Sequence, residues 1–394
     1  MSSPTETRVR NIAVDVYRGF VMLLMMAEVL RLSAVARAYP DSAFWSFLSY
    51  HQSHVQWAGC SLHDLIQPSF SFLVGVALPY SIASRLAKGA TFPKMLLHAL
   101  WRAFLLAAMG IFLRSTGSAQ TNFTFEDTLT QIGLGYPFLF CLGFVKPRWQ
   151  WTALGAILFG YWLAWALWPV PNGGCVPPDG TSANVFVQNY TGFMAHWNKN
   201  CNLGASFDLW FLNLFPRAKV FVANGGGYLT LSFIPTLGTM LLGAIAGRWL
   251  KNSAPQIPLK RFCIAGAAGI AAGLALHFLG ICPVVKRIWT PSWTLFSGGM
   301  CFLLLAGFEW LVELRGFRKP FFPLVVVGMN SIAAYLIAHL FEGFIASSFR
   351  IHLGVNAFAV FGTGLQPLLG GAMVLLVMWW MLYWMYQRKV FLRV

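Results

Sequence analysis

The main pattern in this chain is a series of long apolar runs separated by short polar segments. Each run has close to the roughly 20 residues that a transmembrane helix needs. Ten such runs are found, at residues 12–32, 62–83, 99–115, 128–145, 150–168, 228–250, 262–282, 293–313, 321–345 and 366–387. The pattern therefore predicts an all-α, polytopic integral membrane protein with about ten transmembrane helices.

The composition excludes a soluble enzyme. Of the 394 residues, 57% are hydrophobic and only 10% are charged, whereas about 25% are charged in an ordinary soluble domain. The net charge of +16 would suggest a nucleic-acid ligand in a soluble protein, but here the basic residues lie in the short segments between apolar runs. They are therefore read as topology determinants, and no nucleic-acid partner is expected.

The basic residues also predict the orientation in the bilayer. Most of the 28 Lys and Arg residues fall on the cytoplasmic side if the N-terminus is cytoplasmic, as the positive-inside rule requires. Both termini are therefore predicted to be cytoplasmic. Asp15, Arg18 and Glu28 in the first run argue against a cleaved signal peptide. We expect one transmembrane domain over residues 1–394 with a large extracytoplasmic loop at 169–225.

The seven cysteines show no CxxC spacing, so the sequence supports neither a zinc site nor a thioredoxin-type motif. Most of them lie in apolar runs, where cysteine behaves as a small hydrophobic residue. Cys175 and Cys201 differ because both fall in the large outer loop. That compartment permits disulfides, and we predict that these two cysteines form one.

Several ionisable residues lie inside the apolar runs, where they are costly and mark functional or pairing sites. Asp15 and Arg18 share one helix face, where they either neutralise each other or act in function. His339 and Glu342 are likewise three residues apart in the ninth run. Asn330 precedes them, and its simpler interpretation is an interhelical hydrogen bond.

The densest polar cluster lies just before and at the start of the second run, and it contains His51, His54, His63 and Asp64. No HxH or HxxxH spacing is present, so we expect no metal. Histidine titrates near neutrality and can act as a base or nucleophile. Asp64 can orient a histidine ring or complete a helix capping box with Ser61, and the two roles are compatible.

Three short segments carry a resemblance to a known family. They are VDVYRG at 14–19, HVQWAG at 54–59, and DLIQP at 64–68. Their order and spacing resemble those of the heparan-α-glucosaminide N-acetyltransferase family of membrane acyltransferases, in its bacterial-type branch. That family's pattern is approximately VDxFRG followed by HxxWNGxxxxDLxxP. The resemblance continues through 101–104, 129–133, 286–290 and 328–332.

The chain departs from the family pattern in two places. A family asparagine on the first helix corresponds here to Val29, with Glu28 beside it. An acidic segment before the sixth run is replaced by Asn224-Gly225-Gly226-Gly227. The acceptor of this branch is therefore expected to differ.

The resemblance implies transfer of an acetyl group from cytosolic acetyl-CoA to an amino sugar or glycan on the extracytoplasmic side. It implies that His54 is catalytic. From their chemistry, we expect Asp64 to orient His54 and Asn330 or Lys286 to stabilise the oxyanion. The candidate acetyl-CoA-binding residues are Arg18, Arg102, Gln131, Lys146 and Arg148. The candidate acceptor-binding residues are Trp57, Glu28, Lys286, Trp289, His339 and Glu342.

Two other functions fit the same polar lining. One is a membrane transporter of a small polar or glycan-type substrate, because polar midspan residues also describe a substrate pathway. The other is O-acylation of envelope glycans by the same scaffold. The expected partners are acetyl-CoA, the acceptor and the lipid bilayer, and a homodimer is a possible assembly.

Overall fold

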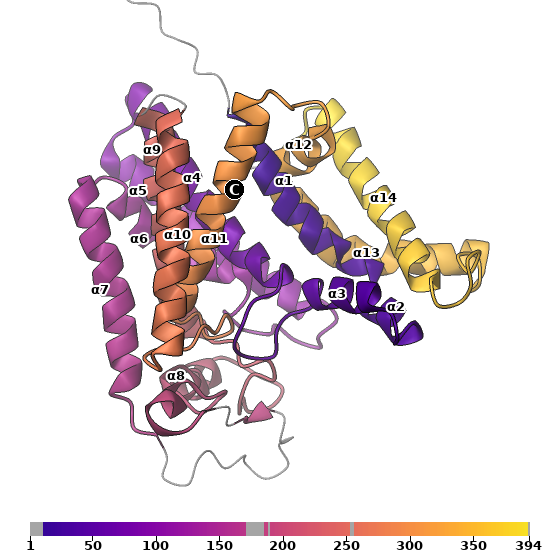
Figure 1. Ribbon diagram of the computed structural model, residues 1–394, viewed down its shortest axis with the longest axis horizontal. Coiled ribbons are helices and arrows are strands. Elements are labelled where there is room, and N and C mark those ends of the chain that lie inside the picture. Colours follow the sequence, from indigo (N-terminus) through magenta and orange to yellow (C-terminus); the bar gives the residue numbers. More distant parts are fainter. Residues whose placement is uncertain (1–10, 171–184, 188–189, 253–255, 393–394) are drawn as a thin grey trace, which may run out of the picture. The chain divides into compact units, whose positions relative to one another are not determined.

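The computed structural model describes residues 11–170, 185–187, 190–252 and 256–392. Their contacts divide the chain into two compact units. Unit 1 comprises Met1–Arg31 and Leu304–Arg393, and unit 2 comprises Leu32–Leu303. Figure 1 shows that the described parts of both units are built from helices.

Unit 2 contains the longer series of helices. Its α-helices are α2 (Leu32–Ala38), α3 (Ala43–His51), α4 (Ile66–Ala87), α5 (Phe92–Ser115), α6 (Thr128–Leu142), α7 (Pro147–Ala166), α8 (Leu203–Phe211), α9 (Phe233–Asn252), α10 (Gln256–Phe278) and most of α11 (Pro291–Phe308). Short 3-10 helices are η2 (His63–Leu65), η4 (Gly192–Trp197), η5 (Leu212–Leu214) and η6 (Thr230–Ser232). Part of the predicted outer loop, 169–225, thus forms η4, α8 and η5.

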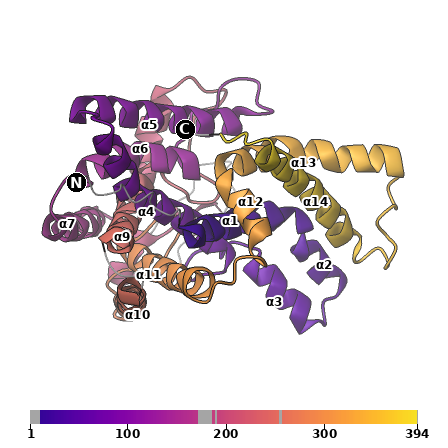
Figure 2. The same ribbon diagram turned by 90° about the horizontal axis from the view of Figure 1, so that it is seen from above.

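Helices α4 and α9 form the centre of unit 2, between α5 and α6 on one side and α10 and α11 on the other (Figure 2). Glycines bring the two backbones into direct contact. A Cβ at Gly75 would lie 1.9 Å from the Met240 carbonyl oxygen, and one at Gly243 would lie 1.9 Å from that of Phe72. Small residues at such a crossing allow the close packing that holds membrane helices together. This pair is the rigid support of the segment that precedes α4.

Unit 1 is assembled from both ends of the chain. Its helices are α1 (Ile12–Met26), η1 (Ala27–Leu30), the end of α11, the π-helical segment η7 (Glu309–Leu314), α12 (Phe322–Met329), α13 (Ser331–Leu353) and α14 (Gln366–Gln387). Gly19 packs against the Leu324 carbonyl, and Gly328 packs against that of Asp15. These contacts hold α1 against α12.

The predicted membrane character agrees with the helices. Among the described residues, seven helices are long and apolar enough to span a bilayer, or eight if a bent pair is counted as one span. All ten predicted runs contain helix, but α6 has only 15 residues and falls short of that length. The number ten therefore stays a prediction, as does the single domain.

The ninth predicted run, 321–345, differs in detail from the structure. It contains two helices, α12 and α13, which meet at Asn330, and α13 continues to Leu353. Asn330 has φ −130° and ψ 42°, which is not a helical conformation. The apolar pattern continues across this residue, so the break between the two helices could not be predicted from the hydrophobicity of the sequence.

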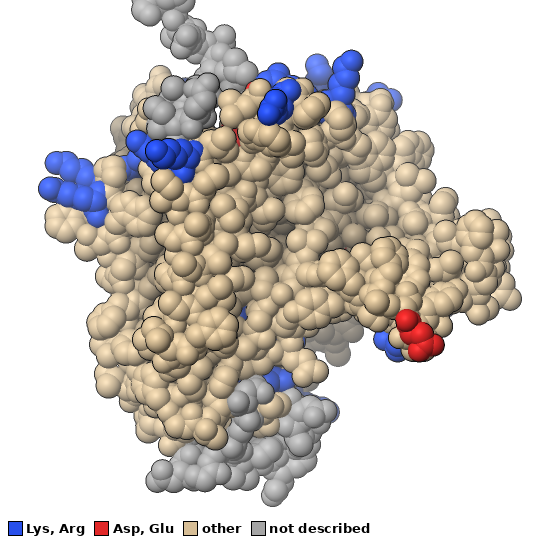
Figure 3. Space-filling model, viewed as in Figure 1, with Lys and Arg blue, Asp and Glu red and all other residues tan. Residues whose placement is uncertain are grey.

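Basic side chains gather at one end of unit 2, where α7 and α10 begin (Figure 3). Lys146 is the N-cap residue of α7, and Arg148 lies in its first turn. Lys260 and Arg261 lie near the start of α10. This grouping is the pattern that the positive-inside rule describes, although the orientation itself stays a prediction.

Candidate functional site

The site is built from two segments that are far apart in sequence. One is the segment 52–62 between α3 and η2, and the other is the segment 279–290 between α10 and α11. Ala58 and Val285 form an antiparallel bridge, and the Gly59 N–H donates to the Val284 carbonyl at 3.1 Å. Gly59 has φ +119°, which a residue with a side chain rarely adopts. This turn aligns the two segments side by side.

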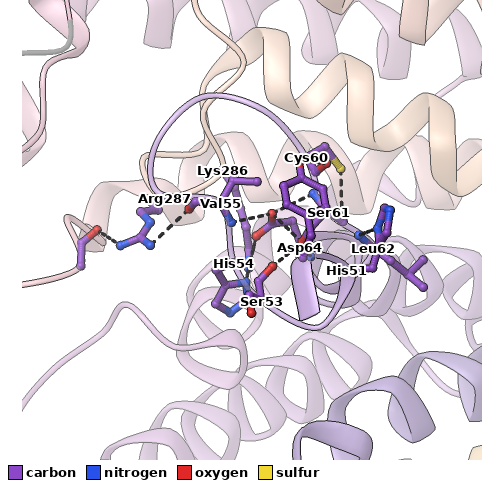
Figure 4. Close-up of polar contacts among 12 residues, drawn as sticks. His51, Ser53, His54, Val55, Cys60, Ser61, Leu62, Asp64, Lys286 and Arg287 are labelled. Carbon is purple, nitrogen blue, oxygen red and sulfur yellow. Dashed lines mark hydrogen bonds and ion pairs between the residues drawn. The ribbon is translucent and has the colours of Figure 1, made fainter. Parts of the chain in front are cut away.

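Three charged or titratable side chains meet at this junction (Figure 4). His54 Nδ1 lies 2.8 Å from Asp64 Oδ1. Lys286 Nζ lies 3.3 Å from the same carboxylate oxygen and 3.1 Å from His54 Nδ1. An ionised carboxylate only accepts hydrogen bonds, so we assign the hydrogen to Nδ1, which donates it to Asp64. Lys286, which can only donate, then pairs with the carboxylate and not with Nδ1. This tautomer leaves Nε2 of His54 with its lone pair.

The second oxygen of Asp64 holds the surrounding backbone. The N–H groups of Val55 and Ser61 donate to Asp64 Oδ2 at 3.2 and 3.0 Å. The Asp64 N–H in turn donates to Ser61 Oγ at 3.3 Å. This exchange is the reciprocal pattern of a capping box. Asp64 therefore contacts the His54 ring through Oδ1 and, at the same time, caps the following helix through Oδ2.

Burial differs sharply among the three residues. The side chains of Asp64 and Lys286 are 1% and 4% exposed, whereas that of His54 is 37% exposed. Desolvation lowers the pKa of His54 below its ordinary value, opposed by Asp64 and assisted by the Lys286 cation. Burial lowers the pKa of Lys286 to about 8, although Asp64 opposes that shift. At neutral pH the imidazole is therefore uncharged beside an Asp64–Lys286 ion pair.

Arg287 fixes the backbone around His54, a role that the sequence did not reveal. Its guanidinium donates to the Val55 carbonyl at 3.2 Å and to the Gly226 carbonyl at 2.6 Å. It also lies over the Tyr228 ring, 5.3 Å from the centroid. Arg287 thereby ties the His54 segment to the glycine-rich segment 224–227.

The two tryptophans predicted to contact the acceptor are buried. Trp57 is 5% exposed, and its indole N–H donates to the Trp197 carbonyl at 3.0 Å. Trp289 is 1% exposed, and its N–H donates to Thr239 Oγ1 at 3.1 Å. The geometry gives both side chains a packing role beside the site.

The candidate acetyl-CoA-binding residues of unit 2 lie in different surroundings. The buried Gln131 amide donates to main-chain carbonyls, among them that of Phe125 at 2.6 Å. Arg102 donates to the Tyr136 hydroxyl at 3.1 Å. Lys146 and Arg148 lie at the basic end of the unit, where α7 begins. Their assignment to acetyl-CoA stays a prediction.

The candidate residues of unit 1 form two groups. Arg18 lies 3.8 Å from Asp15, so the two residues form an ion pair. Such a pair agrees with mutual neutralisation, one of the two roles that their spacing suggested. The Glu342 carboxylate lies within electrostatic range of Arg31, Glu28 and His339. The sequence singled out three of these four residues but missed Arg31.

Asn330 is engaged with the C-terminal segment. Its Nδ2 donates to the Val390 carbonyl at 2.9 Å, and its Oδ1 accepts from the Leu392 N–H at 3.0 Å. Both polar atoms of the amide are therefore used within unit 1. An oxyanion role for Asn330 stays a prediction.

The predicted disulfide joins Cys175 and Cys201. Cys175 lies outside the described residues, and Cys201 is buried. The pairing stays a prediction. Within the described part of the chain, no group of three or more His, Cys, Asp and Glu side chains is placed to hold a metal ion.

Sequence comparison extends the resemblance noted from the short motifs. Heparan-alpha-glucosaminide N-acetyltransferase from Homo sapiens is 26% identical over 380 residues, covering 86% of this chain and 54% of the human protein. The Mus musculus protein of the same name is 24% identical with the same coverage. The chain thus spans about half the length of the curated relatives it matches, and no family model matches it. The predicted resemblance to these proteins is confirmed.

Proposed function

We propose, from this similarity and from the site geometry, that the chain is a membrane acetyltransferase. It moves an acetyl group from acetyl-CoA to the amine of an amino sugar or glycan on the extracytoplasmic side. The observation that carries this proposal is the cluster of His54, Asp64 and Lys286, which keeps an uncharged imidazole with one ring nitrogen available. Such a group is what acyl transfer needs as a nucleophile or base.

Two routes use the same atom, His54 Nε2. In the first, Nε2 attacks the thioester carbonyl, the C–S bond breaks, and coenzyme A leaves as a thiolate that takes a proton from solvent. The acceptor amine then attacks the acetyl-imidazole, and the imidazole is restored. In the second, Nε2 takes a proton from the acceptor amine while the amine nitrogen attacks the thioester carbonyl. The C–S bond then breaks, and Nε2 gives the proton to the departing thiolate.

Asp64 and Lys286 support both routes. Asp64 holds the Nδ1–H tautomer and stabilises the positive charge that forms when Nε2 gains a proton or an acetyl group. Lys286 lies on the Nδ1 side of the ring, so we assign it to fixing the carboxylate and not to direct contact with the oxyanion. Its charge also favours the neutral imidazole before reaction.

Acetyl-CoA is proposed to bind from the cytoplasmic side. Lys146 and Arg148 at the basic end of unit 2, with Arg102 of the same unit, supply charge-assisted hydrogen bonds for its phosphates. This arrangement fits ten spans with both termini cytoplasmic in a bacterial inner membrane. The acceptor then meets His54 on the opposite side.

The test uses the purified full-length chain in lipid nanodiscs. Thiol release from acetyl-CoA is followed with a panel of amino sugars and hydroxyl-bearing glycans, and the products are identified by mass spectrometry. We expect an N-acetylated product, and at least about a 100-fold loss of transfer in His54→Ala, the usual scale of general acid-base catalysis. His196→Ala, which alters a half-buried histidine outside the cluster, is the matched control.

The outcomes separate the rival functions. Wild-type turnover in His54→Ala at equal folded amounts overturns the assignment. Acetylation of hydroxyls alone indicates an O-acyltransferase. Substrate movement across the bilayer without thiol release indicates a transporter.

A further inference from the structure

Unit 1 contains a pocket that the proposed reaction does not use. It has a volume of about 250 Å³ and lies where η1 ends, α13 ends and α14 begins. Arg31, Arg350 and Gln366 line it together with apolar side chains such as Val29, Phe349 and Val374. The pocket therefore combines positive charge with apolar walls.

Its two arginines are available to a ligand. Both are exposed, and neither forms an ion pair within the part of the chain that the structure describes. Glu342 and Glu28 carry negative charge in the neighbourhood of Arg31, which leaves Arg350 as the less compensated cation. The first turn of α14 adds the positive partial charge of a helix N-terminus.

The backbone fixes the shape of this pocket. Arg31 has φ +50°, a left-handed conformation that is uncommon for residues other than glycine. A Cβ at Gly371 would lie 2.1 Å from the Val29 carbonyl oxygen, so α14 packs directly on η1. The wall between Val29 and Gly371 thus admits no larger residue.

The position along the helices places the pocket at the membrane surface. Arg31 follows the end of η1, Arg350 lies in the last turn of α13, and Gln366 is the first residue of α14. Helices α13 and α14 are both long and apolar enough to span a bilayer. Arginines at the ends of such helices lie at headgroup depth. Close by in sequence, Ile351 and Phe361 are 75% and 68% exposed, as suits contact with acyl chains.

We propose that this pocket binds the phosphate headgroup of an anionic membrane lipid. Arg31 and Arg350 contact the phosphate oxygens by charge-assisted hydrogen bonds. The acyl chains lie along the apolar walls and leave the pocket toward the bilayer, because 250 Å³ accommodates a headgroup but not a whole lipid. Charge complementarity, together with apolar walls that match acyl chains, identifies the ligand as an amphiphile.

The test is native mass spectrometry of the full-length protein in detergent with three probes. Phosphatidylglycerol carries both phosphate and chains, diacylglycerol carries the chains alone, and glycerol phosphate carries the phosphate alone. We expect retention of phosphatidylglycerol only. The Arg31→Gln/Arg350→Gln double variant should lower its apparent affinity at least about tenfold, since hydrogen bonds to charged groups are the stronger ones.

Arg388→Gln, at the other end of α14, is the matched control and should retain the lipid. Arg350→Gln alone serves if the double variant is unstable. Equal retention in the variants and the wild type, or equal binding of diacylglycerol, overturns the proposal. Tight binding of glycerol phosphate overturns the lipid identity and indicates a soluble anion.

Discussion

Two polar clusters of this protein contain the same kinds of side chain in different settings. In unit 2, His54 meets Asp64 and Lys286 at distances of 2.8 and 3.1 Å, and the two partners are buried. In unit 1, Glu342 lies in the electrostatic range of Arg31, Glu28 and His339, and those three residues are exposed. His339 uses its Nδ1 on the Tyr335 carbonyl of its own helix at 2.9 Å.

The difference between the two clusters shows that the chemistry of a histidine depends on the group that its Nδ1 contacts and on the burial of that group. A carboxylate hydrogen-bonded to Nδ1 stabilises the charge that forms at Nε2, and burial keeps water from weakening that effect. A backbone carbonyl on Nδ1 holds the ring but carries no net charge. The geometry supports the proposal that His54 takes part in proton or acyl transfer. His339 has its Nδ1 on a backbone carbonyl, and its contact with the acceptor stays a prediction.

The strongest way to break this comparison is to remove one carboxylate from each cluster. In Asp64→Asn, transfer should fall at least about 100-fold because the amide no longer stabilises the charged ring. The free energy of unfolding should fall by about 3–5 kcal/mol, since Lys286 is left buried without a partner. Glu342→Gln is the matched change and should cost under about 1 kcal/mol. Initial rates measure the loss of transfer, and chemical denaturation measures the loss of stability. Equal losses in Asp64→Asn and Glu342→Gln would contradict the difference between the two clusters.

A pH profile sharpens the assignment of roles. The rate should rise with pH through the pKa of His54, which lies below its usual value, because only the neutral imidazole reacts. It should fall near pH 8, where Lys286 loses its proton. In Lys286→Met the alkaline limb should vanish and the acidic limb should move to higher pH, because the cation no longer lowers the pKa of His54. An unchanged profile contradicts the role of Lys286.

The smallest expected effect concerns the guanidinium that supports His54. Arg287→Lys should lower kcat about tenfold with little change in KM, since a lysine cannot hold both the Val55 and Gly226 carbonyls. Arg217→Lys is the matched control, because Arg217 also binds main-chain carbonyls, at Leu212 and Phe123, away from the cluster. Comparable loss of kcat in both variants would indicate a general effect on folding.

The helices were predictable because membrane spans are set by apolar length alone. The contact between His54 and Asp64 could also be predicted, because the two residues are only ten positions apart and the capping pattern of Ser61 and Asp64 begins between them. The contact with Lys286 could not be predicted, because the two residues are more than 200 positions apart in sequence. Such a contact depends on how α10 and α11 pack and on where the segment between them lies. For Trp57 and Trp289, contact with the acceptor stays a prediction, because an aromatic ring serves buried packing and sugar binding equally well. Sequence alone does not separate these roles.

The hydrogen bonds between Asn330 and the C-terminal segment have a practical consequence for purifying the protein. The Val390 carbonyl and the Leu392 N–H are both held by this amide. An affinity tag fused directly after Leu392 would start beside the junction of α12 and α13 and compete for its space. Purification schemes should therefore insert a flexible spacer of several residues before any C-terminal fusion.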